Sequence, residues 1–98
     1  MRIIVPHHTT RAAARKRIEE RFSQLLGEYG RHADDAQHTW SGDTLQFKGK
    51  AKGFKIEGSV EVTDSEVIFD GKLPLLAKPF EPKIRQTVER ETERMFRA

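Results

Sequence analysis

The sequence predicts an α+β fold in which a curved five-stranded antiparallel sheet carries two helices on one face. Apolar residues recur every three or four positions in residues 11–29 and again in residues 81–97, which is the period of an amphipathic helix. Between these segments the apolar residues alternate with polar ones, as in strands with one dry and one wet face. A short β-prone run at residues 2–7 adds a first strand. The predicted order is therefore β-α-β-β-β-β-α.

The composition indicates a single domain, residues 1–98. Of these residues 36% are hydrophobic and 34% are charged, which allows one modest core. We expect no transmembrane segment, since no run of about 18 apolar residues is present, and no secretory signal, since the apolar stretch at the start is too short. The absence of cysteine excludes disulfides and thiolate metal sites and fits a cytoplasmic protein.

The first half of the chain is predicted as strand, helix, loop and hairpin. Thr9 or Thr10 caps a helix over residues 11–29, and Gly30 ends it. Polar residues 31–36 are predicted as a loop. Trp40 and Leu45 flank the turn residues 41–43, which predicts a hairpin.

The second half is predicted as two further strands and a helix. Residues 49–53, with two glycines and two lysines, are predicted as a flexible basic connection. Strands are expected over residues 54–62 and up to Leu73, with a turn at 63–65 between them. Pro82 suits the first turn of the last helix.

The segment LPLLAKPFEPKI, residues 73–84, has two interpretations. Its prolines end the last strand and precede the last helix. In the first interpretation Leu75, Leu76 and Phe80 fill the corner between strand and helix. In the second they form a partly exposed apolar rim that meets a partner.

The net charge of +3 is unevenly spread, because basic residues exceed acidic ones in residues 1–55 and not in the remainder. Such asymmetry is typical either of a solvated basic helix face or of a protein with an anionic partner. A nucleic-acid-binding regulator is one alternative function. It is disfavoured because the aromatic residues are predicted on the core face and acidic residues share the wet face with the lysines.

The sequence contains no recognisable catalytic or metal-binding motif. The four histidines lack the spacing of a metal site, and adjacent His7 and His8 would point to opposite faces of a strand. Asp34 and Asp35 lie in a predicted loop and Asp43 and Asp64 in predicted turns, and no nucleophile or phosphate-binding motif is present. We therefore predict a protein that is not an enzyme and that has no metal or cofactor.

Three segments resemble a known family. They are WSGDTLQF, GFKIEGSVEV and LPLLAKPFEPKIR, and they resemble the small bacterial polyhydroxyalkanoic acid system proteins, also called the polyhydroxyalkanoate granule-region family. The resemblance spans residues 38–96, while the N-terminal strand and helix match in pattern only; an additional Lys50-Ala51-Lys52 loop and Pro82 depart from the family pattern. The residues that carry it are Trp40, Gly42, Asp43, Leu45, Phe47, Gly58, Val60, Val62, Leu75, Leu76, Pro79, Phe80 and Ile84.

The resemblance implies an accessory role in the polyester system and supplies no catalytic residues. In one mechanism the protein binds the granule surface or a granule-associated protein. The contact residues would be Leu75, Leu76 and Phe80 with Arg11, Arg15, Lys50, Lys52 and Lys55.

In the alternative mechanism a groove between the sheet and the last helix holds a small hydrophobic ligand such as an acyl chain. The lining residues would be Trp40, Phe47, Phe54, Val60, Phe69, Val88 and Met95, which otherwise form a filled core. By fold analogy alone, the same element order occurs in each half of the TATA-binding protein and, with insertions, in START-like lipid carriers. The sequence leaves the oligomeric state open.

Overall fold

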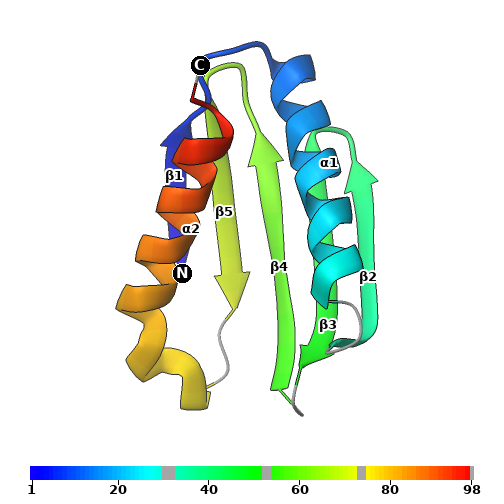
Figure 1. Cartoon of the computed structure of the whole chain (residues 1–98), viewed down its shortest axis with the longest axis vertical. Coiled ribbons are helices and arrows are strands. Elements are labelled where there is room, and N and C mark those ends of the chain that lie inside the picture. Colours follow the sequence, from blue (N-terminus) through cyan, green and yellow to red (C-terminus); the bar gives the residue numbers. More distant parts are fainter. Residues whose placement is uncertain (30–32, 52–53, 73–74, 98) are drawn as a thin grey trace.

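The computed structural model describes residues 1–29, 33–51, 54–72 and 75–97. It contains a five-stranded antiparallel sheet with the strand order β1-β5-β4-β3-β2 (Figure 1). The strands are β1 (Arg2–Pro6), β2 (Ala33–Ser41), β3 (Thr44–Ala51), β4 (Phe54–Val62) and β5 (Glu66–Lys72). The predicted α+β architecture is confirmed.

Both helices lie on one face of the sheet (Figure 1). Helix α1 (Arg11–Tyr29) lies in front of β3, between β4 and β2 in this view, and α2 (Glu81–Met95) lies on the side of β1 and β5. The Thr10 hydroxyl accepts a hydrogen bond from the backbone N–H of Ala13 at 3.1 Å, so Thr10 caps α1. Pro82 lies in the first turn of α2, where its missing N–H leaves no hydrogen bond unmade.

The alternation of side chains along each strand places the core between the sheet and the helices. The buried residues from the strands are Ile3, Val5, Leu45, Val60, Val62 and Val67, and those from the helical segments are Ala14, Ile18, Thr92 and Phe96. Their neighbours in each strand point to the opposite face, which no described element covers. We call this surface the open face of the sheet.

Gly58 lies at a tightly packed position on the helix-covered face of the sheet. Gly58 of β4 is paired with Phe47 of β3 on one side and with Gly71 of β5 on the other. A Cβ atom at Gly58 would lie 2.8 Å from the Asp70 carbonyl oxygen and 2.9 Å from Cζ of Phe47. The phenyl ring therefore occupies the space that a side chain at residue 58 would need.

The structure corrects two predicted loops. Residues 33–36 belong to β2, where Ala33 and Asp34 pair with the end of β3, and β3 continues through Gly49 to Ala51 in the predicted basic connection. The pairing of β2 with β3 shifts its register between Asp34 and Gln37, as at a β-bulge. Gly30, Leu73 and Pro74 lie outside the described residues.

Candidate partner-binding site

Phe80 is an exposed aromatic residue where the last two helical segments meet. The 3-10 helix η2 (Leu75–Phe80) runs directly into α2, and Phe80 is the residue before the first turn of α2. Its side chain is 63% exposed and neither caps the helix nor fills the core. The interpretation that Phe80 fills the corner is therefore wrong, because η2 turns this residue outward instead of under the helix.

Phe80 borders a small apolar hollow on α2. The hollow has a volume of about 260 Å3, and its lining is almost wholly apolar; it is formed by Phe80, Lys83, Ile84, Thr87 and Val88. Residues four apart on a helix share a face, which brings Phe80, Ile84 and Val88 into one row. Lys78 and Lys83 are exposed on either side of Phe80 in the sequence. We call Lys78, Phe80, Lys83, Ile84 and Val88 the α2 tip.

Several predicted contact residues cannot be placed at the α2 tip. The side chains of Leu75 and Leu76, and the whole of Lys52, lie outside the described residues. Lys50 and Lys55 are cross-strand partners, are exposed and lie at the same end of the sheet as η2 (Figure 1). Their alternation in the strands places them on the open face.

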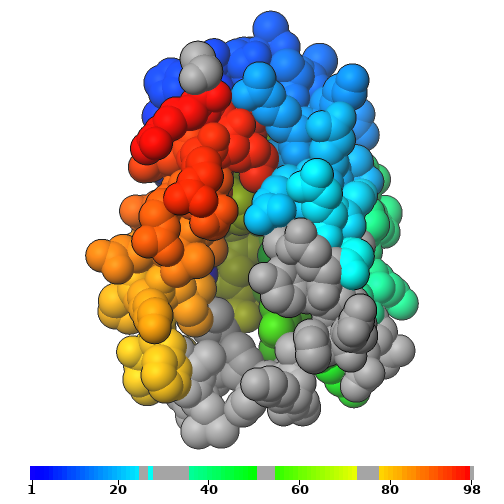
Figure 2. All heavy atoms as spheres, viewed as in Figure 1, coloured from blue at the N-terminus to red at the C-terminus, as the bar shows by residue number. Residues whose placement is uncertain are grey.

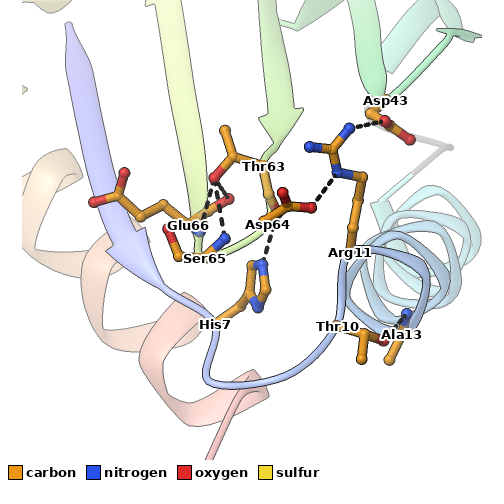
Figure 3. A network of polar contacts seen from close by, with 9 residues as sticks. All are labelled: His7, Thr10, Arg11, Ala13, Asp43, Thr63, Asp64, Ser65 and Glu66. Carbon is orange, nitrogen blue, oxygen red and sulfur yellow. Dashed lines mark hydrogen bonds and ion pairs between the residues drawn. The ribbon is translucent and has the colours of Figure 1, made fainter.

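Arg11 lies at the opposite end of the sheet, where its charge is already paired (Figure 3). Its guanidinium donates to Asp43 in the β2–β3 turn at 2.8 Å and to Asp64 in the β4–β5 turn at 3.0 Å. The hydrogen bond with Asp43, followed by the charge of Asp64, raises the pKa of Arg11. This residue therefore ties α1 to two turns.

His7 anchors the same end from inside the protein (Figure 3). Its ring is buried, and Nδ1 accepts a hydrogen bond from the backbone N–H of Thr9 at 3.2 Å. The hydrogen of the neutral ring is therefore on Nε2, which donates to the Thr63 carbonyl at 2.8 Å. The ring also contacts Phe96, with 6.0 Å between ring centroids. His8 is exposed and has a positive φ of 53°.

The predicted groove residues divide between the core and its margin. Val60 is buried, and Trp40, Phe47, Phe69 and Met95 are partly buried against the core. Val88 lines the hollow at the α2 tip, and the side chain of Phe54 lies outside the described residues. In the space-filling view the helix-covered face is hollowed between the orange-red α2 and the blue-cyan α1 (Figure 2).

Trp40 belongs to a polar cluster under α1 and not to the α2 side. Its indole N–H donates to Glu19, and the Arg15 guanidinium lies 4.7 Å from its ring centroid. His38 Nε2 lies 3.4 Å from the other oxygen of Glu19. The hydrogen bond from Trp40, followed by contributions from His38 and Arg15, lowers the pKa of Glu19 despite the opposing effect of partial burial.

This cluster is a side-chain contact that joins helix α1 to strand β2. Among the described residues, the hydrogen bond of the His38 ring goes to Glu19, and no hydroxyl nucleophile joins the pair as in a hydrolytic triad. The described part of the chain also contains no group of three or more histidine and carboxylate side chains arranged to hold a metal ion.

The lowered pKa of Glu19 predicts a pH-dependent contribution to stability. A carboxylate with a depressed folded-state pKa stabilises the fold above its unfolded pKa and loses that effect as the pH falls through the folded value. We therefore expect Glu19→Gln to unfold at lower denaturant concentration than the parent near pH 7, with the difference closing at acidic pH. Fluorescence of Trp40, the single tryptophan, reports the transition.

Glu20→Gln is the matched control for this comparison, since Glu20 is the exposed neighbour of Glu19 on α1. Its midpoint should follow that of the parent at both pH values. A difference between Glu19→Gln and the parent that stays constant with pH would contradict the assigned role of Glu19.

The open face carries charges of both signs, which occur together in rows across neighbouring strands. Lys48, Glu57 and Lys72 are neighbours across three strands, as are Ser59, Asp70 and Arg2. A shallow hollow of about 620 Å3 lies over this polar surface. A nucleic-acid site needs basic residues concentrated on one surface, and the described residues of this face do not provide that.

A comparison with protein-family models shows to which family the chain belongs. Residues 1–96 match the model described as "Putative polyhydroxyalkanoic acid system protein (PHA_gran_rgn)". The chain belongs to this family. The family match includes the N-terminal strand and helix, for which the sequence resembled the family in pattern only. No curated protein and no solved structure matched the chain, so the analogies with the TATA-binding protein and START-like domains remain fold-level comparisons.

In this member of the polyhydroxyalkanoic acid system family, the exposed α2 tip is the candidate contact surface. No helix among the described residues is long and apolar enough to cross a membrane. The sequence interpretation missed Lys78, Lys83 and Ile84 as parts of this surface. The four-residue spacing of Phe80, Ile84 and Val88 is the signal for this row, but the sequence predictions place Phe80 among the contact residues and Val88 in the groove.

Proposed function

We propose that this polyhydroxyalkanoic acid system protein is a non-enzymatic accessory that binds polyester granules, or a protein on their surface, through the α2 tip. The observation that carries the proposal is Phe80, whose exposed fraction of 63% exceeds that of Ile4 and Ile56, the other large exposed apolar residues of the described chain. An exposed aromatic beside an apolar hollow supplies area that becomes buried on contact.

The flanking lysines add the second component of surface binding. Adsorption to an apolar surface depends on buried apolar area and on attraction between basic side chains and anionic groups. Lys78 and Lys83 lie next to the apolar residues of the α2 tip. The proposal assigns no granule contact to Arg11, whose charge Asp43 and Asp64 pair at the far end of the sheet. The proposed location is the granule boundary in the cytoplasm.

Phe80→Ser tests the proposal directly. Burial of a phenylalanine side chain is worth roughly 1.5–3 kcal/mol, so its loss should weaken co-sedimentation with native granules about tenfold. The free energy of unfolding should change by less than about 0.5 kcal/mol, because the side chain is exposed. Granule binding and thermal unfolding should be measured on the same preparation.

Ile4→Ser is the matched control. Ile4 is 50% exposed and lies on the open face, away from the α2 tip, so its replacement should leave granule binding intact. Equal losses for the two variants, or unchanged binding of Phe80→Ser, would contradict the proposal. Granules stripped of protein by protease distinguish a polyester surface from a protein partner, and anionic liposomes control for general adsorption.

An acyl-binding module is a second candidate, favoured by the hollow that Phe80, Ile84 and Val88 line. Its volume of about 260 Å3 lies slightly below the usual range for small-molecule sites and suits a short chain. Native mass spectrometry of protein purified from polyester-accumulating cells separates the candidates. An apo mass, together with no thermal shift from hydroxy acids or acyl-CoA, would count against a ligand carrier.

A further inference from the structure

Strand β2 presents an open edge to solvent. Within residues 1–29, 33–51, 54–72 and 75–97 it is the outermost strand of the sheet and pairs with β3 alone, and Figure 1 shows its outer side beyond α1. An edge strand carries a row of backbone N–H and C=O groups with no partner on the outer side, and these groups are a template for another strand.

The two edges of the sheet differ in how they are protected. Edge strand β1 ends at Pro6, and the Arg85 guanidinium donates to the Arg2 carbonyl at 2.8 Å. In β2 the register shift between Asp34 and Gln37 interrupts the first part of the strand. The remaining segment, residues 37–41 (Gln-His-Thr-Trp-Ser), is regular and contains neither proline nor a lysine, arginine, aspartate or glutamate. It lacks the usual features that prevent edge pairing.

The hairpin geometry determines which backbone groups face outward. Ser41 pairs with Thr44 across a two-residue turn, Gly42–Asp43, in which Gly42 has a φ of 61°. Such a turn closes on a hydrogen-bonded pair, and hydrogen-bonded and non-hydrogen-bonded pairs then alternate along the strands. The backbone groups of Ser41, Thr39 and Gln37 therefore point to β3. Those of Trp40 and His38 point away from the sheet.

We propose that two copies of this chain pair antiparallel through residues 37–41 of β2, with Thr39 on the twofold axis. In this register His38 of each copy exchanges both backbone hydrogen bonds with Trp40 of the other, which gives four hydrogen bonds. Gln37 of each copy then lies opposite Ser41 of the other. A twofold axis closer to Gln37 would bring the irregular part of β2 into the paired segment. An axis closer to Ser41 would bring the turn into it.

The side chains of the proposed pair are complementary. His38 and Trp40 lie on the helix-covered side, where Glu19 contacts both and Arg15 lies over Trp40. Because Glu19 contacts both His38 and Trp40, the Glu19 residues of the two copies lie near the level of the twofold axis. Arg15 lies over Trp40, and the axis places Trp40 of one copy beside His38 of the other. The Arg15 cation of each copy thus faces the His38–Glu19 pair of the other, and threonines meet at the centre of the interface on the open face. A second copy therefore suits this edge better than an unrelated peptide.

Cysteine substitutions test the register, because the parent chain contains no cysteine. Residues opposite each other in a non-hydrogen-bonded pair have Cα atoms about 4.5 Å apart, within the range that a disulfide spans. Thr39→Cys should form a covalent dimer under mild oxidation at least tenfold faster than Gln37→Cys or Ser41→Cys alone. A mixture of Gln37→Cys with Ser41→Cys should form a mixed dimer. Equal rates for all single variants, with no mixed dimer, would overturn the register.

Sedimentation equilibrium tests the association without a cross-link. Thr39→Lys places two like charges at the twofold axis and should shift the dissociation constant upward at least tenfold. Gln46→Lys adds the same charge on the open face at the β3 neighbour of Thr39, one strand further from the axis, and should change the constant less than threefold. A parent protein that stays monomeric up to about 1 mM, or equal effects of the two lysines, would overturn the proposal.

Discussion

Replacement of Gly58 by alanine should lower the free energy of unfolding by about 2 kcal/mol. The new Cβ atom would lie 2.8 Å from the Asp70 carbonyl oxygen and 2.9 Å from Cζ of Phe47, both closer than van der Waals contact allows. The carbonyl belongs to the paired strand β5 and cannot move without disturbing the ladder. Urea unfolding followed by Trp40 fluorescence measures the change.

Gly71 provides a matched control in the neighbouring strand. It is the β5 partner of Gly58, and a Cβ atom at this position would have no atom within 4 Å from the described residues other than its chain neighbours. Gly71→Ala should therefore be neutral or stabilise by up to about 1 kcal/mol, since alanine reduces the entropy of the unfolded chain. Similar destabilisation by both substitutions would show that a general intolerance of alanine in these strands is responsible, and not the contact with Phe47 and Asp70.

Replacement of His7 by leucine should cost about 3 kcal/mol of unfolding free energy. The substitution keeps an apolar side chain beside Phe96 but leaves the Thr63 carbonyl and the Thr9 N–H without their ring partners. Each buried polar group that loses its hydrogen bond costs about 1–3 kcal/mol. Denaturant unfolding of the parent and the variant measures this effect.

His7→Gln separates hydrogen bonding from packing at the same position. The glutamine amide can donate to the Thr63 carbonyl in place of Nε2, so we expect about half of the loss caused by leucine. If glutamine were no better than leucine, the shape of the imidazole ring and not its hydrogen bonds would account for the role of His7.

Much of the fold was predictable because its signals are local. The period of apolar residues placed α1 at residues 11–29 and α2 from residue 81, as observed. Turn residues at 41–43 and 63–65 placed two of the strand connections. The predictions for residues 33–36 and 49–51 failed because pairing between β2 and β3, and not the composition of either segment, holds these residues in the sheet.

The candidate site depended more strongly on the tertiary structure. The sequence identified Phe80 as either a core or a contact residue, and the choice required the path of η2. Trp40 and Arg15 belong to two different predicted sites, but the Arg15 guanidinium of α1 lies over the Trp40 ring of β2, and Glu19 joins Trp40 to His38. Contacts between side chains far apart in the chain leave no local pattern in either segment.

By itself the sequence determined the α+β class, the element order and the family, because hydrophobic periodicity, turn residues and motif segments act over a few neighbouring residues. The tertiary structure alone decided that Phe80 is exposed, that Arg11 is paired at the far end of the sheet, and that residues 37–41 form a regular segment of the edge strand β2. Exposure, charge pairing and edge position depend on which distant segments meet, and that is settled only when the strands adopt their order and register.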